Sequence, residues 1–62
     1  MVEKILYDII LDEQIVGDSG DMEFYTKAEA QADADDFIIS ELSKEYNRKV
    51  SDFKVSLYKA IY

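Results

Sequence analysis

The sequence predicts an α+β fold, in which a three-stranded antiparallel sheet carries one helix on one of its faces. Residues 4–11 and 52–61 show the apolar period of two that is typical of strands, and residues 27–47 show helical periodicity. A second strand is expected at about residues 15–25, so the order of elements is β-β-α-β. A helix that returns along the sheet delivers the last strand antiparallel to the first, and the preference for right-handed crossovers favours the spatial order 2-1-3. We expect residues 1–62 to form a single domain.

Residues 4–11 are expected to form the central strand, because they are rich in β-branched and aromatic side chains. Alternation divides these side chains into two sets, with Ile5, Tyr7, Ile9 and Leu11 on one face and Leu6, Asp8 and Ile10 on the other. Both sets are largely apolar, which suits a strand with neighbours on both sides better than an edge strand.

The second strand is expected to follow a turn at residues 12–14, and it is interrupted at residues 17–21, which contain both glycines of the chain. An alternative is a first strand that continues to Val16 and turns at residues 17–20. We favour the earlier turn.

The parity of the apolar residues changes within the second strand. Ile15 occupies an odd position, whereas Met22 and Phe24 occupy even ones. These side chains can share a face only if a bulge or a loop absorbs one residue.

A capping box from Thr26 to Glu29 predicts the start of the helix. In such a box the hydroxyl of Thr26 accepts a hydrogen bond from the N–H of Glu29, and the carboxylate of Glu29 reaches back to the N–H of Thr26. Apolar side chains then recur at three- and four-residue spacings and mark the side that faces the core, namely Ala30, Ala34, Phe37, Ile38, Leu42 and Tyr46. Asn47 and the β-branched Val50 indicate that the helix ends near residues 47–49.

The last strand, residues 52–61, alternates again. Its apolar set, Phe53, Val55, Leu57 and Ile61, is expected to face the helix, and Lys59 is the exception in this set. The other set consists of Lys54, Ser56, Tyr58, Ala60 and Tyr62.

The charge of the chain is strongly polarised. Its formal charge of −7 at pH 7 combines −8 over residues 12–36 with +2 over residues 37–62 and −1 over residues 1–11. Acids in the first turn of a helix complement its dipole, which accounts for Glu29 but not for the acids that follow. Carboxylates this close together repel one another, so stability alone does not select them.

A partner-binding acidic surface is therefore expected along residues 21–36. Clustered charge of one sign accelerates the encounter with an oppositely charged partner, although surface acids also serve solubility alone. At about 100° per residue, the helix projects several acids from the side opposite the core, where Glu29, Asp33, Asp36 and Ser40 lie together. The expected surface consists of Asp33, Asp35, Asp36, Glu29, Asp21 and Glu23.

The sheet face away from the helix is a second candidate interface. One helix covers one face of three strands, which leaves Leu6, Ile10, Tyr58, Ala60 and Tyr62 uncovered. Tyrosine is enriched in interfaces because its ring is rigid and apolar and its tip is polar. We expect this face to bind a second copy or another protein.

The composition argues against several classes of function. Without His or Cys the chain lacks the commonest general base, the thiol nucleophile, the zinc ligands and the disulfide. Neither an enzyme nor a cofactor is expected. The acidic surface disfavours direct contact with nucleic acid or anionic lipid. The first residues carry no secretory signal and no segment is long enough to span a bilayer, so we expect a soluble, cytoplasmic protein.

Calcium binding through carboxylates is a further alternative. Residues 18–23 superficially resemble a calcium loop, but an EF-hand loop requires acids or amides at its third and fifth positions. Gly20 and Met22 stand there, so an acidic surface turn is the preferred interpretation.

One resemblance covers most of the chain. Tyr7, the run Phe24-Tyr25-Thr26, and then Glu29-Ala30, Ala34 and Phe37 resemble the β-β-α-β layout of small phage and mobile-element proteins, including acidic inhibitors of bacterial defence systems. The resemblance implies an inhibitor that occupies a basic, nucleic-acid-binding surface on a host protein. Together with the composition, it leads us to expect a small, non-enzymatic protein-interaction module.

Overall fold

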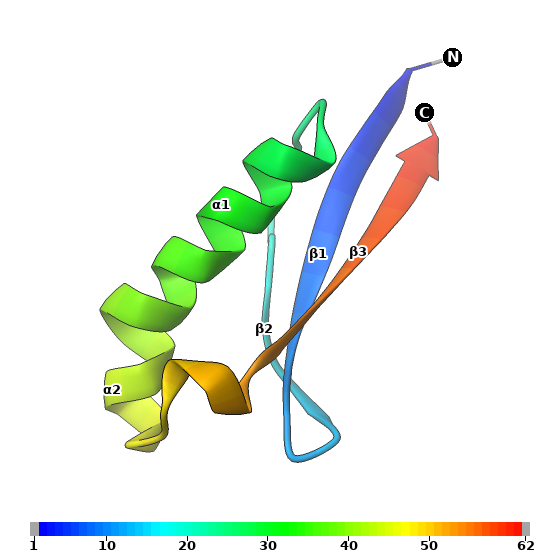
Figure 1. The fold of residues 1–62 in the computed structure, drawn as a ribbon. Coiled ribbons are helices and arrows are strands. Elements are labelled where there is room, and N and C mark those ends of the chain that lie inside the picture. Colours follow the sequence, from blue (N-terminus) through cyan, green and yellow to red (C-terminus); the bar gives the residue numbers. More distant parts are fainter. Residues whose placement is uncertain (1, 62) are drawn as a thin grey trace.

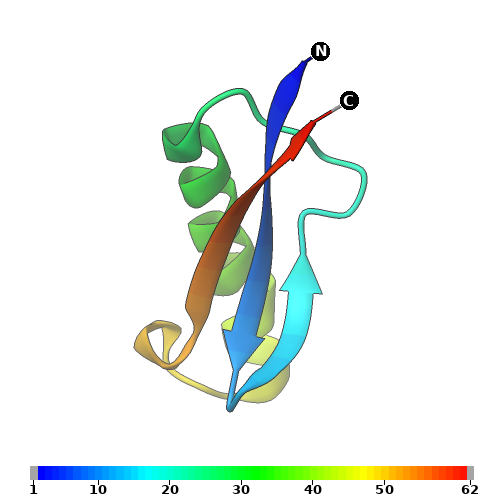
Figure 2. The ribbon, with the colours of Figure 1, turned by 90° about the vertical axis from the view of Figure 1, so that its right-hand side faces the viewer.

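The computed structural model describes residues 2–61 and has the predicted α+β fold (Figure 1). Strands β1 (Glu3–Leu11), β2 (Gln14–Asp18) and β3 (Lys54–Ile61) form one sheet in the order β2-β1-β3, and both neighbouring pairs are antiparallel. A long helical segment packs on one face of this sheet, while the other face is open to the viewer in Figure 2. The predicted order of elements and the central place of the first strand are confirmed.

A two-residue turn joins β1 to β2, as we favoured from the sequence. Asp12 and Glu13 have positive φ angles of 51° and 67°, and Leu11 pairs with Gln14 across the turn. Positive φ at both central residues is the geometry of a type I′ turn, whose twist matches that of the flanking strands. Asn-Gly fills such a turn most readily, so Glu13 occupies a backbone conformation that disfavours its side chain.

A β-bulge interrupts the pairing of β1 with β2. The register shifts between Ile9 and Ile10, which leaves Val16 as the additional residue of β2. Beyond the bulge Ile15 lies opposite Ile10 and is 64% exposed, whereas Phe24 is buried in the core. Ile15 and Phe24 therefore lie on different faces of the sheet.

Strand β2 is shorter than expected, but the chain continues to bond to β1 after it ends. The N–H of Ser19 donates to the carbonyl of Tyr7 at 3.0 Å, and the Ser19 hydroxyl accepts from the N–H of Tyr7 at 3.3 Å. Further along, Ile5 and Phe24 exchange two backbone hydrogen bonds of 2.6 and 3.1 Å. Between these contacts, residues 20–23 leave the edge of the sheet as a loop (Figure 2).

Thr26 caps the helix as predicted. Its hydroxyl oxygen accepts from the N–H of Glu29 at 3.2 Å. The carboxylate of Glu29 accepts from the Thr26 hydroxyl at 2.9 Å, instead of from the Thr26 N–H as the capping box predicts.

The helix winds in three parts, α1 (Lys27–Phe37), a π-helical turn η1 (Ile38–Leu42) and α2 (Ser43–Tyr46). Its buried side chains are all four residues apart, namely Ala30, Ala34, Ile38 and Leu42. On an α-helix each such step turns the stripe by about 40° away from its starting direction. The wider π turn offsets part of this drift and keeps Leu42 in the core. The helix ends at Asn47, whose φ is 53°, in agreement with the predicted end.

The core lies between the helix and one face of the sheet. It consists of the predicted side chains of β1 and the helix together with two phenylalanines, namely Ile5, Tyr7, Ile9, Leu11, Phe24, Ala30, Ala34, Ile38, Leu42 and Phe53. Tyr46 and Ile61 were expected with this set but are exposed. Tyr46 packs edge-on against Phe53 beyond the helix's last core residue, and Ile61 lies at the end of β3.

Replacing Glu13 with Gly should stabilise the protein, because glycine adopts a positive φ without the steric penalty that Glu13 carries. We expect a gain of about 0.5–1 kcal/mol in the free energy of unfolding, measured by urea denaturation. The exposed Gln14 has no positive φ, so Gln14→Gly is the control and should destabilise the protein. A loss of stability in Glu13→Gly would contradict the type I′ turn.

Candidate functional site

Tyr7 is the polar side chain at the centre of the core, and only 1% of it is exposed. Its ring stacks against Phe24 with the ring centroids 6.1 Å apart. Its hydroxyl donates a hydrogen bond to Oδ2 of Asp33 at 2.7 Å. Burial raises the pKa of Tyr7 above its ordinary value, and the hydrogen bond and negative charge of Asp33, followed by the charge of Asp18, raise this pKa further.

Asp33 therefore has a structural role that the sequence did not reveal. It was expected to project into solvent with the other acids, but it is partly buried and it accepts the hydrogen bond of Tyr7. A buried tyrosine hydroxyl needs an acceptor, and this requirement explains an acid one residue before the buried Ala34. The idea that local structure gives no reason for Asp33 is thus wrong.

The helix turns one acid of its stripe, Asp33, toward the sheet. Tyr7 donates a hydrogen bond to Asp33, and the charge of Asp18, the last residue of β2, also acts on this hydroxyl. Phe37, one helical turn after Asp33, lies against Gly17 of β2, where a Cβ would stand 3.6 Å from the phenylalanine ring. Glu29 and Asp36 share this stripe with Asp33 because of their spacing.

The loop after β2 carries two further acids. Asp21 and Glu23 are exposed and belong to the segment between β2 and Phe24. We call the acids of this loop and of the helix stripe the acidic flank, and it consists of Asp21, Glu23, Glu29, Asp33 and Asp36. Asp18 is not part of the flank, because it pairs with Asp8 of β1, whose side chain lies on the sheet face away from the helix.

Asp35 lies apart from the acidic flank. Two residues after Asp33, it is rotated by about 200° around the helix axis, toward the opposite side. There it accepts a hydrogen bond from Nε2 of Gln31 at 2.9 Å. The other five residues of the sequence-based surface lie on the acidic flank.

The ion pairs found among residues 2–61 do not include the acidic flank. Arg48 donates to both carboxylate oxygens of Asp12, at 2.7 and 3.3 Å, and to Asp52 at 3.1 Å. Lys59 pairs with Glu3 at 3.8 Å. None of these pairs includes a member of the flank.

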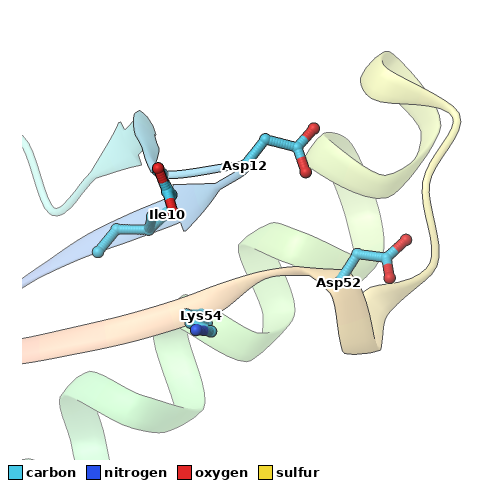
Figure 3. A pocket seen from close by; sticks show the side chains of 5 residues that line it. Ile10, Asp12, Asp52 and Lys54 are labelled. Atoms are coloured by element: carbon cyan, nitrogen blue, oxygen red, sulfur yellow. The ribbon is translucent and has the colours of Figure 1, made fainter.

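A shallow hollow of about 330 Å³ lies at the other end of the sheet, between the β1–β2 turn and the start of β3 (Figure 3). It is lined by Ile10, Asp12, Glu13, Asp52 and Lys54. The two aspartates, which approach from different segments, both bond to Arg48, and this hydrogen bond lowers the pKa of Asp12. The two aspartates of the hollow thus have a structural role, since through them Arg48 joins the hairpin turn to the segment η2 (Val50–Asp52).

The uncovered sheet face is divided by a polar row. Leu6 lies opposite Tyr58, which is 43% exposed, and Ile10 lies opposite Ile15. Between these apolar pairs, Asp18, Asp8 and Ser56 line up across the three strands. Tyr62, expected on this face, lies outside the described residues.

The Asp8–Asp18 pair places like charges opposite each other, which costs stability. Oδ1 of Asp18 accepts a hydrogen bond from the N–H of Gly20 at 2.8 Å, in a local turn.

In the part of the chain that the structure describes, His, Cys, Asp and Glu form no group of three or more that could hold a metal ion.

Among residues 2–61, the helices fall short of the length and apolar character needed to cross a membrane.

Comparison of the chain with protein-family models, curated proteins and solved structures gave no match.

The stability of the protein should fall at alkaline pH in a way that depends on Tyr7. The folded state holds the phenolic proton more tightly than the unfolded state, so stability is lost as the pH rises above the ordinary tyrosine pKa of about 10. Urea denaturation at pH 8 and at pH 11 should show this loss in the wild type and a smaller loss in Tyr7→Phe. Tyr25→Phe, at an exposed position, retains the ring that Lys4 covers; it is the control and should keep the wild-type slope. Equal slopes in all three proteins would contradict the bond to Asp33.

Proposed function

We propose that this protein is a non-enzymatic binding protein that docks its acidic flank on a basic surface of another protein. One observation carries the proposal: five acids of the helix and of the loop after β2 make up the flank, and none of the ion pairs among residues 2–61 includes them. Only Asp33 and Glu29 have structural roles there, as the acceptor of Tyr7 and as part of the helix cap. The remaining three, Asp21, Glu23 and Asp36, carry negative charges that a basic partner would attract.

Electrostatic attraction suits this geometry because it acts before contact. A flank of one sign steers a basic partner toward the correct side of the molecule and speeds association. Nucleic acids and anionic membranes carry the same sign as the flank, so a protein rich in Lys and Arg is the fitting class of partner.

The resemblance to small phage and mobile-element proteins extends this proposal to inhibition. A partner whose basic surface binds nucleic acid would lose that surface to the acidic flank, because carboxylates and phosphates attract the same Lys and Arg side chains. We propose this competition as the mode of action. The compartment in which it takes place would be the cytoplasm, where such partners act.

Self-association through the uncovered sheet face is the second candidate function. The Leu6–Tyr58 and Ile10–Ile15 pairs favour it, since they place apolar side chains on that face. The polar row of Asp8, Asp18 and Ser56 counts against it, because an apolar partner surface would have to desolvate two carboxylates.

Charge reversal tests the acidic flank. In a pull-down from the native host, the double variant Glu23→Lys, Asp36→Lys should retain far less partner than the wild type, and retention should fall steeply between low and high salt. Asp33 and Glu29 are left intact so that the fold is not disturbed.

The double variant Asp35→Lys, Glu45→Lys is the matched control, because it changes the net charge equally while leaving the acidic flank intact. It should retain about as much partner as the wild type. Equal losses in both double variants, or retention that ignores salt, would contradict the proposed docking.

A further inference from the structure

Strand β3 is an edge strand of the sheet that residues 2–61 form. It follows β1 in the sheet order, and no further strand lies beyond it in the described chain (Figure 2). The opposite edge is different, since β2 has only five residues, carries a bulge and ends in the loop that leaves the sheet. A regular, eight-residue edge such as β3 is the kind that accepts another strand.

The hydrogen bonds of β1 show which groups of β3 are available. Ile5 and Tyr7 bond to the β2 side, through Phe24 and Ser19. In an antiparallel ladder, bonding alternates along the strand, so the residues of β1 between them bond to β3. Their partners on β3 are Ala60, Tyr58, Ser56 and Lys54.

The remaining residues of β3 direct their backbone groups outward. Val55, Leu57 and Lys59 thus present N–H and C=O groups at the free edge, one residue in two. Such a row is a template for one more strand.

The distribution of charge favours the β3 edge as the side on which a second copy meets least repulsion. Asp21 and Glu23 belong to the loop that follows β2, and Asp33 lies on the helix side that meets Gly17 of β2, whereas β3 carries Lys54 and Lys59. Two copies joined at their β3 edges would hold their acidic flanks at the two far sides. Joined at any other side, they would bring these flanks closer together.

The sequence of β3 is also compatible with pairing to itself. We propose that β3 of one copy pairs with β3 of a second copy in antiparallel orientation, with Leu57 at the two-fold axis. The two three-stranded sheets then form one continuous six-stranded sheet. In this register Val55 lies opposite Lys59 of the second copy, and Lys54 lies opposite its Ala60. No lysine faces a lysine.

The dimer goes beyond the proposed function and does not depend on it. It would present two acidic flanks on one particle, so that a partner with two basic sites would be bound with increased avidity. It would also supplement the small core, which is near the lower limit for a single domain of this size.

Two variants at one position test the edge directly. Lys59→Pro removes one outward N–H and no hydrogen bond within the monomer, and proline is tolerated on edge strands. Lys59→Ala is the matched control, because it loses the same side chain and the same ion pair with Glu3 but keeps the N–H.

Light scattering at protein concentrations of about 10 µM to 1 mM should give a mass approaching twice 7.2 kDa for the wild type and for Lys59→Ala. Lys59→Pro should stay near 7.2 kDa. A monomeric wild type at the highest concentration, or a Lys59→Pro variant that dimerises as well as Lys59→Ala, would overturn the proposal. Loss of the dimer in Tyr58→Ser alone would instead place the interface on the uncovered face.

Hydrogen exchange tests the interface on the wild-type protein, without any substitution that could alter the fold. Exchange at the amides of Val55, Leu57 and Lys59 should slow at least about tenfold as the dimer forms, because these groups become bonded. The amides of Ser56 and Tyr58 bond to β1 in either state and should not change with concentration. Exchange at Leu57 that is independent of concentration in a dimeric sample would overturn the β3 edge as the interface.

Discussion

The structure depends on the burial of Tyr7 between the sheet and the single helix. Its backbone pairs with Ser19, its ring stacks on Phe24, and its hydroxyl bonds to Asp33 of the helix. One side chain thus contacts each segment that covers this end of the core. A phenol in an apolar core is stable only if its hydroxyl has an acceptor, and a carboxylate at 2.7 Å is a strong one. This bond determines which side of the helix lies next to β2.

The two sides of the molecule follow from that orientation. With Asp33 turned toward the Tyr7 hydroxyl, Glu29 and Asp36 of the same stripe lie next to it on the helix, and Asp35 falls on the opposite side. The β3 side is left with few acids and a regular free edge. The polarity that first appears as a charge difference along the sequence therefore becomes a difference between two sides of the fold, one suited to a basic partner and one to a second copy.

Local patterns predicted the fold well because each depends on neighbouring residues. Alternation identified the buried face of β1, and Thr26 marked the start of the helix. The features that escaped prediction depend on residues far apart in the chain, such as the bonds of Asp33 to Tyr7 and of Arg48 to Asp12. The π turn escaped as well, because the four-residue spacing of the core side chains is compatible with an α-helix over a few steps. Asp33 could not be separated from the other acids by sequence alone, because its bond to Tyr7 is one of these distant contacts.

A double-mutant cycle between Tyr7→Phe and Asp33→Ala, with stability measured by urea denaturation, tests this account most directly. If the buried hydrogen bond orients the helix, the two substitutions should be coupled by about 1–3 kcal/mol. Asp36→Ala, an acid of the same stripe without a contact to Tyr7, should show no coupling to Tyr7→Phe. Additive effects of Tyr7→Phe and Asp33→Ala, to within about 0.5 kcal/mol, would show that Asp33 does not hold the tyrosine and would contradict the arrangement of both sides.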